Sequence, residues 1–276
     1  MANYTTADIK ALREKTAAGM MDVKKALDEA DGDMAKAEDI LRVKGLKGVT
    51  KREGRTASNG LVTAVAGDGV GTLVEVLCET DFVAKGDRFG ALAQQILDQA
   101  VATKSTDAAT LLASTLPDGR TVQALVDEAN ATIGEKIEVK RVAHLEGDHV
   151  ASYLHKTSPD LPAQIGVLLA TTGEGREIAR DIAMHIAAFA PSVLTRDEID
   201  PAVVEHERKV AEDTAKEEGK PEAALPRIIE GRVNGFFKET VLLEQAFAKE
   251  MKKTVAVILK EAGADVTAFA RFRVGA

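Results

Sequence analysis

The chain contains an internal duplication, and this feature restricts its fold more than any other. The first copy starts with LVTAVAGDGVGTLVEVLCETDFVAKGDRFGALAQQILDQAVA and the second with VASYLHKTSPDLPAQIGVLLATTGEGREIARDIAMHIAAFAP. Each segment has a strand, a turn, a longer β-branched strand and a helix with apolar residues three and four positions apart. The longer strands are expected at Val70–Cys78 and Ile165–Thr171. Two similar folding units are therefore predicted.

The two copies also end alike. The segments RTVQALVDEANATIGEKIEVKRVAHLEG and KTVAVILKEAGADVTAFARFRVG each predict a helix that begins near a threonine, followed by a closing strand. Each copy should form a small antiparallel sheet backed by helices, in the order strand, strand, helix, helix, strand. We therefore predict an α+β fold, with the first unit at residues 60–148 and the second at residues 149–276.

The second copy carries an insertion, at about residues 195–239, that the first copy lacks. Charged residues dominate it. Val203, Val210 and Thr214 recur at near-heptad spacing, and the segment Gly219-Lys220-Pro221 suits a helix stop and restart. This pattern predicts an antiparallel helical hairpin that projects from the body. A stabilising arm and a contact surface are equally compatible with it.

Residues 1–45 predict three short helices that pack as a small bundle. The second helix is expected after Asp22, and Asp33 is a suitable cap for the third. We place the end of the third helix at Gly45. The basic, glycine-rich segment 46–59 has little periodicity and is interpreted as a mobile linker.

Composition favours a folded protein with aliphatic cores and a protein partner. The 276 residues include no Trp and only 4% aromatic residues, so Ala, Val, Leu and Ile must fill the cores. The net charge of -8 argues against general nucleic-acid binding, which needs clustered Lys and Arg. The start, MANYTTADIKALREK, resembles no secretory signal, and no apolar stretch is long enough to span a membrane. We expect a cytoplasmic protein that binds neither nucleic acid nor membrane.

No motif for covalent chemistry stands out. The five histidines have no metal-ligand spacing, and the single cysteine, Cys78, is interpreted as a small buried apolar residue. No Lys-Ser or Lys-Thr pair follows the glycines of AGDGVG, so a hairpin turn explains them better than a phosphate-binding loop. We expect no catalytic residues, no metal and no cofactor, and hence a protein that is not an enzyme.

Packing leaves two places unexplained. The first is the segment Glu79–Lys85, directly after a strong strand, where Phe82 stands among polar residues. From the residues alone we favour Phe82 as an inward anchor of the next helix over an exposed projection. The second is Met20-Met21, two flexible apolar side chains expected in a loop between helices. Core filling and adaptable contact with a partner are equally compatible with this pair.

At these two places the chain resembles the elongation factor Ts family. The run KALREKTAAGMMDVKKALDEADGDMAKAEDILR is similar to that family's ubiquitin-associated-like (UBA-like) module, and CETDFVAK resembles its signature Cys-x-Thr-Asp-Phe-Val. The likeness continues through SYLH, IGVLL and the closing FARFRVG. It implies a three-helix UBA-like bundle followed by two duplicated sheet-plus-helix units.

The resemblance also implies a function and a site. The family promotes release of GDP and magnesium from elongation factor Tu, so that GTP can rebind. Asp81 and Phe82 would enter a groove of the partner's GTP-binding domain near its magnesium, while Thr80 and Val83 would hold the corner.

Further partner contacts are implied outside this corner. The N-terminal module, through Met20, Met21 and Leu12, would grip the same GTP-binding domain. The second unit, through Tyr153 and His155, would reach a β-barrel domain of elongation factor Tu.

Two other functional classes stay in view. In the first, the N-terminal bundle binds a ubiquitin-like or ribosomal partner and the repeats act as a scaffold. In the second, the cleft between the repeats is the site of a small-molecule enzyme. That class needs convergent titratable groups, and a deep polar pocket lined by the histidines would support it.

Overall fold

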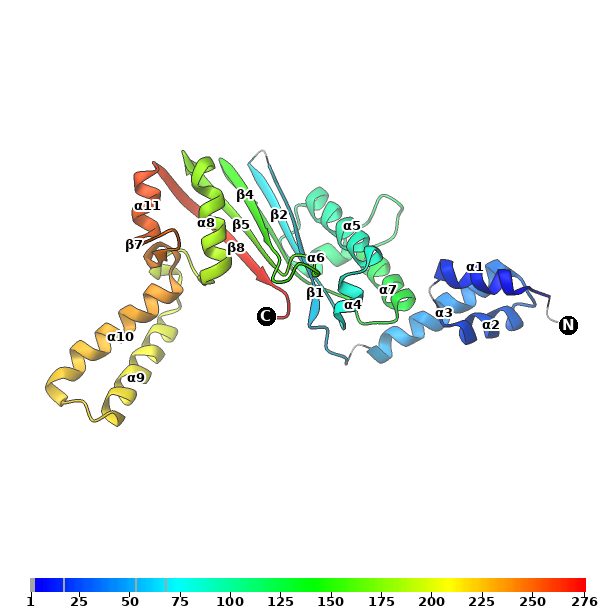
Figure 1. Ribbon diagram of the computed structural model, residues 1–276, viewed down its shortest axis with the longest axis horizontal. Coiled ribbons are helices and arrows are strands. Elements are labelled where there is room, and N and C mark those ends of the chain that lie inside the picture. Colours follow the sequence, from blue (N-terminus) through cyan, green and yellow to red (C-terminus); the bar gives the residue numbers. More distant parts are fainter. Residues whose placement is uncertain (1–2, 17, 53, 68) are drawn as a thin grey trace.

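The computed structural model describes residues 3–16, 18–52, 54–67 and 69–276, and it contains both helices and antiparallel sheets. The predicted α+β class is confirmed. A bundle of helices lies at one end of the molecule, the sheets lie in the middle, and a pair of long helices projects at the other end (Figure 1). Within the described residues, every helix is too short or too polar to span a lipid bilayer.

Three helices form the N-terminal bundle: α1 (Thr6–Thr16), α2 (Met20–Glu29) and α3 (Met34–Arg52). The Asp33 carboxylate caps α3 by accepting hydrogen bonds from the backbone N–H groups of Ala35 (3.0 Å) and Lys36 (3.1 Å). Apolar side chains of all three helices fill a small core of Leu12, Val23, Ala26, Leu27, Ala30, Ala37 and Leu41.

Two expected boundaries in this bundle are wrong. The second helix begins at Met20, before Asp22, so both methionines lie in the first turn of α2 and not in a loop. The third helix continues through Gly45 to Arg52, so residues 46–52 of the expected linker are helical. A glycine in a helix costs about 1 kcal/mol relative to alanine, which weakens a helix without ending it.

Two three-stranded antiparallel sheets form the body, with strand orders β1-β2-β3 and β4-β5-β8. Their strands are β1 Asn59–Gly67, β2 Val70–Cys78, β3 Glu138–Glu146, β4 His149–His155, β5 Ile165–Gly173 and β8 Ala264–Arg273. β1 and β2 pair continuously up to Gly67 opposite Val70, which confirms the hairpin turn expected at the glycine-rich segment.

Helices cover the outer face of each sheet (Figure 1). Those on the first sheet are α5 (Asp87–Thr103), α6 (Ala108–Ala113) and α7 (Val122–Ile133), and those on the second are α8 (Gly175–Phe189) and α11 (Val255–Glu261). Two short strands, β6 (Ala246–Phe247) and β7 (Glu250–Thr254), precede α11. Thr121 and Thr254 cap α7 and α11 through their side chains, as the shared threonine predicts.

The inner faces of the two sheets pack directly against each other, with Val62, Leu73, Val150, Leu168, Ala170 and Phe272 buried between them. Gly71 and Gly166, each the second residue of its central strand, allow this close approach. A Cβ atom at Gly166 would lie 2.5 Å from Val62 Cγ1 and 2.6 Å from Leu73 Cδ1. The body therefore has four layers, with two sheets between two layers of helices (Figure 1).

The insertion contains two long helices, α9 (Pro201–Glu217) and α10 (Leu225–Thr240), which pack together and project from the second unit (Figure 1). The near-heptad residues Val203 and Val210 do not form the seam of this hairpin, because both are exposed. The buried residues are Ala211 and Ala215 on α9 and Val233 and Phe237 on α10. Small side chains on α9 thus let the two helices lie close together.

Candidate protein-interaction site

The strongest candidate site is the corner between β2 and α5, where α4 (Asp81–Ala84) forms one short helical turn. Thr80 caps this turn, because its Oγ1 accepts a hydrogen bond from the Val83 N–H at 3.4 Å. Ala84 is buried and Val83 is half-buried, and both pack on the core of the first unit. The turn therefore uses these two residues as its inward face.

Phe82 lies on the outward face of the same turn and is 82% exposed, more than any other large apolar side chain in the described part of the chain. The expectation of an inward Phe82 is therefore wrong. The anchor of the following helix is Phe89, which is 1% exposed. Burial of a phenylalanine is worth about 1.5–3 kcal/mol, so a partner that covered Phe82 would gain a contact of this size.

Asp81 places a negative charge beside the exposed ring. Its carboxylate pairs with Lys85 Nζ at 2.7 Å, and this hydrogen bond from Lys85 holds the pKa of Asp81 below its ordinary value. The carboxylate is therefore ionised at neutral pH. An apolar ring next to a carboxylate suits a partner surface that has an apolar groove beside a cation.

Side chains from the loop between α7 and β3 hold this corner in place. Glu135 Oε2 accepts hydrogen bonds from the backbone N–H groups of Glu79 (3.1 Å) and Thr80 (3.0 Å), and its Oε1 accepts one from Thr80 Oγ1 (2.6 Å). Glu79 Oε1 accepts a bond from the Lys136 N–H at 2.6 Å. Sequence reasoning missed Glu135, because it lies 55 residues from Thr80 and belongs to no recognisable motif.

Cys78 ends β2 directly before this corner and is fully buried. Its Sγ donates a hydrogen bond to the Thr80 carbonyl oxygen at 3.2 Å. Burial, assisted by the negative charge of Glu135, raises the pKa of the Cys78 thiol to about 12. The thiol is therefore protonated at neutral pH, as its interpretation as a buried apolar residue requires.

The N-terminal bundle presents a second exposed apolar pair. Met20 is 58% exposed and Met21 is 64% exposed, both on the first turn of α2. Leu12, by contrast, is 1% exposed and lies inside the bundle core. The Leu12 side chain therefore has no free surface to offer a partner in this structure. The methionines lie on a different unit from Phe82, so the structure does not bring them to the corner (Figure 1).

Tyr153 and His155 lie near the end of β4, an outer strand of the second sheet. The Tyr153 hydroxyl is 3.1 Å from His155 Nδ1, and the His155 ring is exposed while Tyr153 is half-buried. The loop that follows approaches the corner, because Lys156 and Lys85 line one common pocket. The C-terminal end of β4 therefore lies on the same side of the body as α4.

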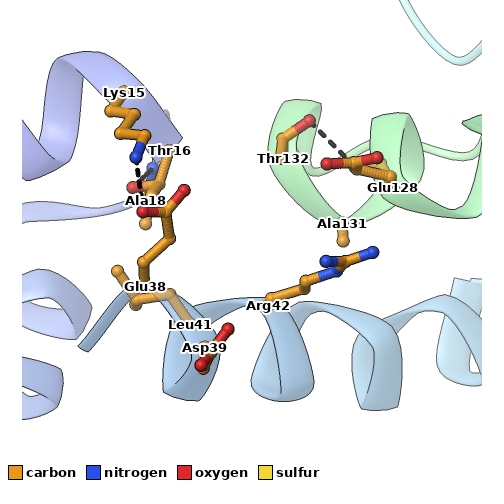
Figure 2. A pocket seen from close by; sticks show the side chains of 10 residues that line it. All are labelled: Lys15, Thr16, Ala18, Glu38, Asp39, Leu41, Arg42, Glu128, Ala131 and Thr132. Carbon is orange, nitrogen blue, oxygen red and sulfur yellow. Dashed lines mark hydrogen bonds and ion pairs between the residues drawn. The ribbon is translucent and has the colours of Figure 1, made fainter. Parts of the chain in front are cut away.

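A pocket of about 140 Å³ lies where the bundle meets α7 (Figure 2). Some of its polar side chains bond to neighbouring protein groups: Lys15 Nζ pairs with Glu38 Oε2 at 2.6 Å, and Thr132 Oγ1 donates to the Glu128 carbonyl oxygen at 2.9 Å. The lining residues are Lys15, Thr16, Ala18, Glu38, Asp39, Leu41, Arg42, Glu128, Ala131 and Thr132, with no histidine or cysteine among them. This pocket thus lacks the histidine lining that a small-molecule enzyme was expected to show.

The histidines are dispersed over the fold. His144 bonds to Thr72 Oγ1 at 2.9 Å, and His185 is buried on α8, where it bonds to Gln245 Oε1 at 2.9 Å. Across residues 3–16, 18–52, 54–67 and 69–276, no three His, Cys, Asp or Glu side chains are grouped as metal ligands. The two histidines named here are therefore explained by packing and local hydrogen bonds.

Comparisons with known proteins give matches to one family. The family profile described as Elongation factor TS matches residues 79–276. The chain is 60% identical to elongation factor Ts of Kineococcus radiotolerans over 276 residues, which cover 100% of both chains. It is 60% identical to that of Acidothermus cellulolyticus, over 100% of this chain and 99% of the relative. It is 59% identical to that of Micrococcus luteus, over 100% of both.

Proposed function

Because the chain belongs to the elongation factor Ts family, we propose that it is the guanine-nucleotide exchange factor of elongation factor Tu. It binds the GDP form of elongation factor Tu, promotes release of GDP and magnesium, and dissociates once GTP has rebound. It acts in the cytoplasm during translation elongation. It makes and breaks no covalent bond, and it uses no cofactor of its own.

Phe82 is the observation that carries this proposal. Its ring is 82% exposed on a turn that is capped by Thr80 and packed on the core through Ala84. Folding alone does not favour an exposed phenylalanine at a fixed corner, whereas insertion into a groove of a partner gives it a use. In the proposed complex, Phe82 and Asp81 enter the GTP-binding domain near the magnesium, and Thr80 and Val83 hold the turn.

Exchange then follows from linkage between two binding equilibria. A factor that binds the nucleotide-free GTPase more tightly than the GDP form must weaken GDP binding by the same ratio. Each tenfold loss of GDP affinity needs about 1.4 kcal/mol of differential contact. Burial of Phe82 supplies about 1.5–3 kcal/mol, so disturbance of the magnesium and of the phosphate-binding backbone must supply the rest.

Other parts of the chain contact elongation factor Tu at a distance from the nucleotide and strengthen binding. We assign residues 1–45 to a UBA-like module that holds the GTP-binding domain through Met20 and Met21, with Leu12 supporting that surface from inside. The units at 60–148 and 149–276 form the body. The second unit reaches a β-barrel domain of elongation factor Tu through Tyr153 and His155.

Release of a fluorescent nucleotide tests the proposal. Elongation factor Tu is loaded with mant-GDP, excess unlabelled GDP is added, and the fluorescence decay is recorded at rising concentrations of this protein. The release rate should rise with concentration and then saturate. Added magnesium should oppose the effect, because the proposed route passes through loss of that ion. A release rate equal to the intrinsic one at every concentration would refute the function.

A further inference from the structure

We propose, on the basis of the exchange function above, that Glu135 is a positioning residue for nucleotide exchange. Its carboxylate fixes the backbone of the Phe82 corner before the partner binds. Glu135 has no covalent role and need not touch the partner, because it acts through the orientation of Phe82.

The contacts of Glu135 reach both sides of the corner. One carboxylate oxygen binds two consecutive backbone N–H groups, those of Glu79 and Thr80, where β2 has ended and α4 has not yet begun. The other oxygen accepts a hydrogen bond from the Thr80 hydroxyl. That bond orients Thr80 Oγ1 so that its lone pair faces the Val83 N–H and caps α4. Thus the same carboxylate sets the chain direction at the corner and the start of the turn that carries Phe82.

Two structural details place Glu135 under the corner. Gly134 ends α7 with a φ of 87°, a left-handed conformation that turns the chain toward β2 directly before Glu135. Glu79, in the corner, bonds in the opposite direction. Its Oε1 accepts a hydrogen bond from the Lys136 N–H at 2.6 Å, and its main-chain oxygen accepts one from Asn59 Nδ2 at 2.8 Å. The two carboxylates therefore cross-brace the corner and the loop below it.

Loss of this brace should slow exchange without removing any partner contact. If the corner is free to move, its backbone must become ordered when Phe82 enters the partner, and that entropy opposes the step. Pre-organisation by Glu135 removes this opposition. Charge-assisted hydrogen bonds such as these are about twice as strong as neutral ones, so a carboxylate is well suited to the task.

Three substitutions separate positioning from general stability. Glu135→Ala removes all three accepted hydrogen bonds. Glu135→Gln retains an oxygen for the two backbone N–H groups and an amide that donates to Thr80 Oγ1, so it should restore most of the function. Glu138→Ala is the matched control, because it removes a carboxylate three residues away that pairs with Lys136 and Lys140 side chains at 3.5 Å.

The test is a double-mutant cycle in the mant-GDP release assay with full-length protein. Glu135→Ala should lower the maximal release rate by about tenfold, Glu135→Gln by less than about threefold, and Glu138→Ala should match the wild type. In a Phe82→Ala background, Glu135→Ala should have little further effect, because the residue acts through Phe82. A merely structural role predicts instead the same fold loss in both backgrounds.

Each outcome bears on one of the two claims. If wild type accelerates release and Phe82→Ala does not, but Glu135→Ala behaves as wild type, the positioning role is overturned and the exchange function stands. The role is also overturned if the loss in Glu135→Ala persists in full without Phe82. If wild type itself fails to accelerate release, both are wrong. Slow release by Glu135→Ala that vanishes in the Phe82→Ala background supports the role.

Discussion

Replacement of Phe82 by alanine should slow nucleotide exchange and leave the fold intact. Full burial of a phenylalanine is worth about 1.5–3 kcal/mol, and 82% of this side chain is free to be buried by a partner. The energy at stake is therefore about 1.2–2.5 kcal/mol, which corresponds to a release rate about 8- to 60-fold lower at subsaturating factor. Because the ring is exposed, its loss should change the free energy of unfolding by no more than about 0.5 kcal/mol.

The assay compares mant-GDP release from elongation factor Tu with wild type, Phe82→Ala and Met251→Ala. Met251 is 60% exposed on β7, so its variant controls for the loss of an exposed apolar side chain in a different place. Urea unfolding of each protein reports its stability. Equal release by Phe82→Ala and wild type would refute the role of the ring, whereas a variant that is unfolded would refute the claim that the exposed ring is not needed for the fold. Phe82→Leu, which keeps a large apolar side chain, should recover part of the rate.

Three further perturbations test the fold. Gly166→Ala should lower the free energy of unfolding in urea by about 1–3 kcal/mol, because its Cβ would overlap Val62 and Leu73, and a neutral result would contradict the close sheet contact. Gly231→Ala, which has open space in α10, should raise that free energy by about 0.5–1 kcal/mol, and a loss would contradict the helix position. Burial lowers the pKa of His185, so the folded state resists its protonation; its contribution to stability is full above about pH 6.5 and is lost on acidification. The urea concentration at the unfolding midpoint should decrease when the pH is lowered from 7.5 to 5.5. An equal decrease in His185→Gln would exclude His185 as its cause.

The duplication could be read from the sequence because its signals are local. Strand alternation, a glycine turn and a capping threonine each depend on neighbours a few positions away. Thr121 and Thr254 therefore begin their helices where the pattern predicts. The helix end predicted at Gly45 is wrong for the same reason, since a local stop signal weakens a helix but does not decide its end.

The candidate site was harder to predict because burial is a property of the whole fold. From the sequence we favour Phe82 as the anchor, and only the packed structure shows that Phe89 enters the core while Phe82 faces outward. Leu12, Met20 and Met21 are likewise all apolar candidates in one small module, yet only the two methionines are exposed. Glu135 was invisible, because no local rule links a carboxylate to a corner 55 residues earlier in the chain.

The most direct test of the central claim is the position of the Phe82 ring in a structure of this protein bound to nucleotide-free elongation factor Tu. The account predicts that the ring, which is 82% exposed in the free protein, is buried in the GTP-binding domain close to the vacated magnesium site. A complex in which Phe82 stays in solvent, or in which another surface covers the nucleotide site, would contradict it.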